Sequence, residues 1–174
     1  AYRAAMGERK APAVAAWVVD WMEDNEGAAI VVFVWHRAVA AAIADALGRD
    51  EAGEPVAFVA TGDDTPEERQ RMVDAFAGGA RRVFIGSIAA CGTGLNGLHK
   101  RTTFAAFGEV AWTPGELTQA IGRVRRFGSV GEHAHAWILV GEDSLEDHVM
   151  QTIAGKLDTA AAVLGDTVAN GSRS

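Results

Sequence analysis

Hydrophobic residues in this chain occur both as short continuous runs and as stripes with helical spacing. Residues Ala28 to Trp35 form a β-branched and aromatic run, which is typical of a strand buried on both faces. The alanine-rich segment from Arg37 to Leu47 is typical of a helix. An earlier stripe predicts a lead-in helix over about residues 8–25, and it consists of Val14, Trp17, Val18, Trp21 and Met22. The chain is therefore expected to begin with a helix, a strand and a helix.

The same start signal predicts two further helices. In this signal a threonine is followed by a proline and then by a glutamate. The first signal is Thr65, Pro66 and Glu68, and the second is Thr113, Pro114 and Glu116. The threonine caps the first turn, the proline fits its start, and the glutamate closes the capping box. We expect these helices to run through Phe76 and to about Arg126.

Four more apolar runs predict strands, so that strands and helices alternate along the chain. These runs are Pro55 to Ala60, Arg82 to Ser87, Thr102 to Phe107 and His133 to Val140. Such alternation predicts an α/β fold with a parallel sheet covered on both faces through right-handed crossovers. We expect one domain over residues 1–166, with its core at about 28–165, a last helix opening near Asp143, and a frayed tail at 167–174.

Composition excludes several classes of protein. Hydrophobic residues make up 49% and charged residues 22%, which is globular rather than disordered composition. The longest apolar stretches are too short to cross a bilayer, and no secretory signal is visible, so we expect no membrane partner. The single Cys91 excludes an internal disulfide. We expect a cytoplasmic protein, associated with the nucleoid or encoded by a phage, or a nuclear one if its source is eukaryotic.

The formal net charge of −7 excludes a uniformly basic protein surface for binding nucleic acid. It still permits a local basic groove built from short clusters. The candidate residues are Arg81, Arg82, Lys100, Arg101, Arg123, Arg125 and Arg126.

The glycine pattern after the third predicted strand first suggests a dinucleotide site. Gly92, Gly94 and Gly97 spell G-x-G-x-x-G. Only Leu98 to Arg101 separate Gly97 from the next strand, which leaves no room for the crossover helix of that fold. No phosphate-binding G-x-x-x-x-G-K-[ST] motif occurs, and no acid is placed to hold magnesium. We therefore expect no ATP hydrolysis by this chain alone, and no metal site of its own.

Three segments resemble motifs of superfamily-two helicases. Residues Trp112 to Gly128 are similar to motif VI, and their Trp-x-Pro lead and arginine spacing resemble those of Swi/Snf-like DNA translocases. Ser87 to Asn96 resembles motif V, and Ile30 to Arg37 resembles motif IV. His36 and the sequence pattern Glu109-x-x-Trp-x-Pro resemble those of the annealing-helicase branch. The resemblance implies a three-layer RecA-like (P-loop NTPase-like) domain, which is the C-terminal lobe of a two-lobe helicase motor.

The same resemblance implies a nucleotide site shared with another lobe. Arg123 and Arg126 would be arginine fingers, since a guanidinium stays protonated and holds phosphate oxygens bidentately. The alternative to this catalytic role is that both are surface arginines in salt bridges. Gln119, Gly94 and Asn96 would contact the nucleotide. ATP and Mg²⁺ would be bound mainly by a first RecA-like lobe, present in cis or in trans.

The remaining implied residues would contact the backbone of double-stranded DNA. They are His36, Arg37, Thr61, Gly62, Ser87 and Thr93. For His36 and Arg37, plain capping of the next helix is an equal alternative. Two departures from the Swi/Snf-like pattern are Gly122, where that family has an acid, and Ser129, where it has glutamine.

The expected function is the C-terminal motor lobe of an ATP-dependent double-stranded DNA translocase. Two alternatives stay open. One is the C-terminal lobe of an RNA helicase, which Gly122 followed by Arg123 also suits. The other is a stand-alone, non-catalytic module that binds nucleic acid or a helicase.

Overall fold

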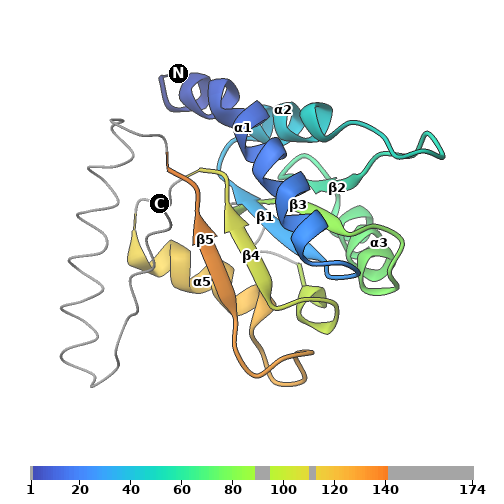
Figure 1. Cartoon of the computed structure of the whole chain (residues 1–174). Helices are drawn as coiled ribbons and strands as arrows, with labels where there is room; N and C mark the ends of the chain where they lie inside the picture. Colours follow the sequence, from blue (N-terminus) through green and yellow to red (C-terminus); the bar gives the residue numbers. More distant parts are fainter. Residues whose placement is uncertain (1, 89–94, 110–112, 141–174) are drawn as a thin grey trace.

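The computed structural model describes residues 2–88, 95–109 and 113–140 (Figure 1). Its elements, in chain order, are α1 (Tyr2–Asp24), β1 (Ile30–Val34), α2 (Arg37–Leu47), β2 (Ala57–Ala60), α3 (Pro66–Ala77), β3 (Val83–Ser87), the short 3-10 helix η1 (Leu98–Lys100), β4 (Phe104–Phe107), α5 (Pro114–Val124) and β5 (His135–Ile138). The predicted last helix, Cys91 and Trp112 lie outside the described residues. Within the described part, no helix combines the length and apolar character needed to cross a membrane.

The five strands form one sheet in the order β2-β3-β1-β4-β5, and every neighbouring pair is parallel. β1 lies at the centre, where Val32 pairs with Ile85 of β3 and with Ala106 of β4. All five residues of β1 are buried, as the continuous apolar run predicts. The parallel α/β architecture expected from the sequence is confirmed.

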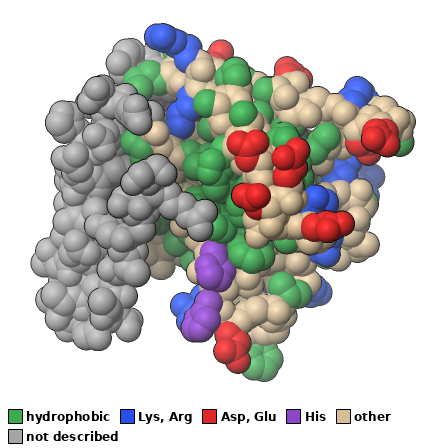
Figure 2. Space-filling model, in the orientation of Figure 1, with side chains coloured by type: hydrophobic (Ala, Val, Ile, Leu, Met, Phe, Trp, Pro, Cys, Tyr) green, Lys and Arg blue, Asp and Glu red, His purple; other side chains and the backbone are tan. Residues whose placement is uncertain are grey.

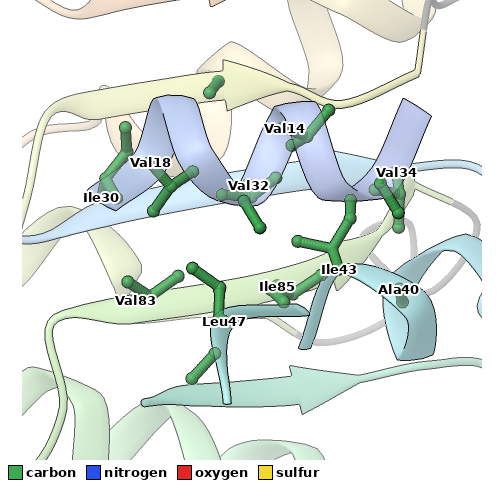
Figure 3. Packing of buried hydrophobic residues seen from close by; sticks show 14 of the residues in the cluster. Val14, Val18, Ile30, Val32, Val34, Ala40, Ile43, Leu47, Val83 and Ile85 are labelled. Atoms are coloured by element: carbon green, nitrogen blue, oxygen red, sulfur yellow. The ribbon is translucent and has the colours of Figure 1, made fainter. Parts of the chain in front are cut away.

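Helices cover both faces of the sheet, and each face has its own core. On one face Val14 and Val18 of α1 and Ile43 of α2 pack against Val32 (Figure 3). On the other face α3 and α5 pack against Phe33, the next residue of β1. Neighbouring strand residues thus serve opposite cores. Each fully buried large side chain contributes about 1.5–3 kcal/mol relative to exposure.

Two helix ends differ from the prediction. α1 begins at Tyr2 instead of near residue 8 and continues through Pro12. Buried Ala11 and Val14 pack its first half into the core, which outweighs the lost backbone hydrogen bond of proline. α5 ends at Val124 instead of near Arg126, because Arg125 adopts an extended backbone. Both capping boxes predicted from the threonine signals are present.

Candidate functional site

The loops that follow β1 to β4 meet at one edge of the sheet, because parallel strands share the edge at which they end. Ser87, the last residue of β3, is only 4% exposed, and its hydroxyl donates to the carbonyl oxygen of Trp35 at 3.4 Å. The loop after β1 therefore rests on the end of β3.

Glu109, which follows β4, is the anchor of the loop after β1. Its carboxylate accepts hydrogen bonds from the backbone N–H groups of Trp35 and His36, at 2.7 and 2.8 Å. The other oxygen lies 2.7 Å from Nδ1 of His36. Glu109 is only 5% exposed, and these three contacts take the place of water around its carboxylate. His36 is the N-cap of α2 but makes no side-chain cap bond, and its ring is held by Glu109 instead.

The loop after β2 carries two carboxylates beside the predicted nucleic-acid contacts. Arg37 forms an exposed ion pair with Asp63. Asp64 accepts from the Thr61 backbone N–H at 2.6 Å and from its hydroxyl at 3.2 Å. Gly62, which follows Thr61 in the same loop, is exposed. Four of the six predicted DNA contacts, together with Ser87, thus lie on adjoining loops, while Thr93 lies outside the described residues.

A second cluster is built around the side-chain oxygen of Asn96. Arg126 donates to this oxygen from Nη1 at 2.9 Å, and Arg123 donates from Nη1 at 3.3 Å. Arg126 is fixed further by its Nε, which donates to the Gly122 carbonyl at 3.0 Å. The two arginines were expected on one helix, but Arg126 lies beyond the end of α5 and still reaches the same acceptor.

The electrostatics of this cluster favour an anion. Two guanidinium groups share one neutral oxygen, and no carboxylate of the described residues forms an ion pair with either of them. Arg123 is 9% exposed, and its Nε has no hydrogen-bond partner in the described chain. Such a buried, unpaired donor is costly unless a ligand or water satisfies it.

His99 interacts electrostatically with Arg126 of this cluster. Burial, followed by the charges of Arg126 and Lys100, lowers the pKa of His99 below its ordinary value. Both causes disfavour the protonated imidazole, and the charge effect comes from Arg126 and Lys100. A negative ligand at Arg126 would offset part of that effect.

Helix α3 joins the two clusters through consecutive residues. Arg69 is buried and donates to the Thr61 carbonyl at 3.2 Å. Gln70 donates to the Asn96 carbonyl at 3.2 Å. The loop after β2 and the arginine cluster are thus held by adjacent positions on one rigid element.

The structure brings together Asn96, Arg123 and Arg126 but does not place Gln119 with them. Gln119 is exposed on α5, and its side chain makes no hydrogen bond to any residue that the structure describes. Gly94 lies outside the described residues. Among those described, no group of three or more His, Cys, Asp or Glu residues is arranged to hold a metal ion.

Sequence reasoning gave no role to Asp63, Asp64 or Gln70, and it used Glu109 only for a family likeness. Glu109 had a usable signal, since an acid directly after a buried strand lies at the functional edge of the sheet. Gln70 and the two aspartates resemble ordinary surface residues in the sequence, and only their contacts single them out.

Comparison with known proteins now decides the family. The family model for the helicase conserved C-terminal domain matches residues 13–128, which is more than half of the chain. This chain belongs to that family. The match contains the arginine cluster, Asn96 and the four loops at the sheet edge.

The fold agrees with helicase lobes of known structure. The C-terminal part of the Fun30 ATPase domain is similar with a TM-score of 0.68 and 20% identity, over 81% of this chain and 43% of that one. The Pyrococcus furiosus Hef helicase domain is similar with a TM-score of 0.61 and 16% identity, over 82% and 28%. The sheet with its flanking helices is a RecA-like helicase C-terminal lobe.

A curated relative comes from Acanthamoeba polyphaga mimivirus and is named "Putative ATP-dependent RNA helicase L364". It is 32% identical over 107 residues, which are 59% of this chain. The chain spans only 19% of the length of that relative. The helicase lobe described here therefore corresponds to a minor part of a larger protein in that case.

Proposed function

We propose that this lobe is the second half of an ATP-dependent motor of the Swi/Snf-like branch, acting on double-stranded DNA. The observation that carries the proposal is the pair of guanidinium groups, from Arg123 and Arg126, that converge on Asn96. The sequence motifs, and the similarity of the fold to that of the Fun30 ATPase domain, support the same assignment.

In the proposed motor the arginines act on ATP held between two lobes. ATP supplies the phosphoryl group, and Mg²⁺ and the phosphates are bound mainly by a first lobe. When the lobes close, Arg123 and Arg126 stabilise the negative charge that develops on the transferring phosphoryl oxygens. Asn96 holds both guanidinium groups close together before closure, so little reorganisation is needed. Gln119 and Gly94 are proposed to contact the nucleotide as well.

The sheet edge would grip the DNA backbone without reading sequence. Arg37 is the main cation of this edge, and it has to exchange Asp63 for a phosphate. That exchange is cheap, because an exposed ion pair contributes only about 0–1 kcal/mol. His36, Thr61, Gly62 and the region of Ser87 and Thr93 would position the same backbone.

A second candidate substrate is RNA, because the mimivirus relative carries the name of an RNA helicase. Both substrates present phosphates to the same edge, so the loop contacts do not favour either. The family likeness in motif VI favours DNA, and the identity with the mimivirus relative favours RNA. The experiment below includes both duplexes.

The proposal is tested by steady-state ATP hydrolysis with this chain alone, and with a first lobe from the same source added or fused. We expect activity only with the first lobe, and stimulation by duplex DNA beyond that by duplex RNA. Arg126→Ala should lower turnover about a thousandfold or more, the scale of an arginine finger. Arg49→Ala is the matched control, because Arg49 is exposed after α2 and its side chain donates to the Gly53 carbonyl, outside the arginine cluster.

Three results would contradict the proposal. Unchanged turnover in Arg126→Ala would remove that residue from catalysis. Hydrolysis by the chain alone, lost in the same variant, would mean that the chain holds a complete phosphate site. Stronger stimulation by RNA would replace the DNA substrate with the second candidate.

A further inference from the structure

A groove of about 910 Å³ lies between α1 and the start of strands β4 and β5. Phe104 and His135 are the first residues of these strands and are paired with each other. The predicted DNA contacts lie in loops after the strands end, so the groove occupies the opposite edge of the sheet. Nothing in the proposed motor function uses it.

Aromatic rings form the walls of this groove. Trp17 and Trp21 of α1 lie 5.6 and 6.1 Å from Trp137 of β5, measured between ring centroids. Phe104 stacks against His135 at 5.4 Å and against Trp137 at 6.1 Å. Trp17, Phe104 and Trp137 are only half-buried, and His135 is exposed. An aromatic ring carries negative charge density on its faces and positive charge density at its edge, so these partly exposed rings offer a cation an attractive surface.

Two carboxylates stand on the same wall. Asp20 and Asp24 line the groove with Trp17 and Trp21, and the four residues share one face of α1 by their spacing. Both aspartates are exposed, and neither forms an ion pair with any described residue. Among the described residues that line the groove there is no lysine or arginine. Figure 2 shows acidic side chains gathered beside the hydrophobic surface over α1.

We propose that this groove binds a lysine or arginine side chain presented by a basic peptide segment of a partner protein. A cation over an indole face is attracted by the ring quadrupole, most strongly with tryptophan. The apolar stem of the same side chain packs on the rings, and its charged head reaches Asp20 and Asp24. A polyanion would be repelled by these carboxylates, which excludes nucleic acid as the occupant.

The binding is measured by tryptophan fluorescence of the whole chain. The chain has five tryptophans, and Trp17, Trp21 and Trp137 line the groove. The probe is the peptide acetyl-(Gly-Lys)₃-amide, and acetyl-(Gly-Glu)₃-amide is its matched control. We expect a saturable change in emission with the lysine peptide and none with the glutamate peptide.

The decisive variant is Asp20→Asn combined with Asp24→Asn, and we expect it to fold because both positions are exposed. We expect it to weaken lysine-peptide binding by about tenfold, the combined effect of removing two exposed charge interactions. The control is Asp45→Asn combined with Glu51→Gln, which changes the net charge equally at exposed sites outside the groove. This control should bind within about twofold of the original chain, because remote surface charges are screened.

Several outcomes would overturn the proposal. Equal weakening in both double variants would mean attraction by net charge alone. Absence of a saturable signal, or unchanged binding in the Asp20 and Asp24 variant, would remove the groove as a cation site. A dimer in sedimentation that is lost in that variant would assign the groove to a second copy of the chain. None of these results bears on the ATP hydrolysis experiment, so the two proposals fail separately.

Discussion

Glu109 joins the two sheet-edge loops that follow β1 and β4. Its carboxylate gathers two backbone N–H groups and one imidazole nitrogen within 2.8 Å. A buried acid in this position orients the first turn of α2, and thereby His36 and Arg37. Its role in the proposed motor is to position the phosphate-binding loop, not to touch a substrate.

Glu109→Gln should reduce the free energy of unfolding by about 1.5–3 kcal/mol. The amide oxygen can still accept from both backbone N–H groups, but the NH₂ group then replaces the oxygen that faces Nδ1 of His36, and the negative charge is lost. Urea denaturation measures this change. Glu51→Gln, in the exposed turn after α2, is the control and should stay within about 0.5 kcal/mol. A loss no greater than that of the control would show that Glu109 does not anchor the loop.

His99 gives a readout of the charge on Arg126. Burial is the main cause of its lowered pKa, and Arg126 is the second. Arg126→Ala should therefore raise the pKa of His99 part of the way toward its ordinary value. An NMR titration of the imidazole protons measures this shift, and an unchanged pKa would place the guanidinium away from the ring.

The same lowered pKa fixes the sign of one stability effect. The native state resists protonation of His99, so the unfolded chain binds more protons as the pH falls below the ordinary histidine pKa. This contribution to stability is therefore complete above that pKa and is lost as the pH falls through the lower native value. His99→Gln should flatten this part of the pH dependence in urea denaturation. An equally steep dependence in the variant would assign it to other groups.

At the scale of elements, two helical glycines give opposite expectations. A Cβ at Gly7 in α1 would lie 2.6 Å from Cγ2 of Val39 and 3.1 Å from the Glu109 carboxylate. Val39 is fully buried in α2 and cannot move aside. A Cβ at Gly122 in α5 would meet nothing within 4 Å. The close approach of α1 to α2 thus depends on Gly7, whereas Gly122 only weakens its helix.

Gly7→Ala should therefore destabilise the fold by about 1–3 kcal/mol through overpacking. Gly122→Ala should stabilise it by about 0.5–1 kcal/mol through helix propensity. Thermal unfolding of both variants and the original chain provides the comparison. A stabilising Gly7→Ala would mean that α1 does not pack as closely on α2 as the structure shows.

The sequence predicted those elements whose signals are local. α2 matches its predicted bounds, and both capping boxes lie where the threonine signals indicate. The strand order is not local, because pairing of β1 with both β3 and β4 depends on the whole chain. The convergence of Arg126 on Asn96 also depends on the turn after α5, and helix periodicity alone does not describe it.

Arg82 shows why a charge cluster in sequence does not identify a site. It was grouped with neighbouring basic residues as part of a possible local basic groove. Its guanidinium instead donates to the carbonyls of Met22, Asn25 and Ala28 at 3.0, 2.7 and 2.7 Å. It therefore donates hydrogen bonds to backbone carbonyl groups at the end of α1 and in the connection to β1. Every residue carries a backbone carbonyl group, so the residue types alone do not reveal this role.

At the scale of the whole molecule, both acidic and basic residues occur at each edge of the sheet. The net charge of −7 opposes DNA at long range, so binding has to come from a few local contacts. The acidic groove lies at the edge where the strands begin, and Arg37 lies at the edge where they end. In the proposed motor the duplex contacts the edge that carries Arg37, away from Asp20 and Asp24.

This arrangement gives a prediction for the salt dependence of duplex binding, which rests on the proposed function. Each phosphate neutralised by a cation adds about 0.9 to the slope of log affinity against log salt concentration. Arg37→Ala should weaken binding and reduce that slope by about this amount. Asp63→Asn should strengthen binding, because it releases Arg37 from its ion pair.

Fluorescence anisotropy of a labelled duplex over a salt series measures both effects. Asp45→Asn serves as the control for Asp63→Asn, since it removes the same charge from an exposed position on α2. If Asp45→Asn strengthens binding as much as Asp63→Asn does, net charge explains the gain and Arg37 is not the contact. If the gain appears only in Asp63→Asn and vanishes when Arg37→Ala is added, the ion pair competes directly with the DNA phosphate.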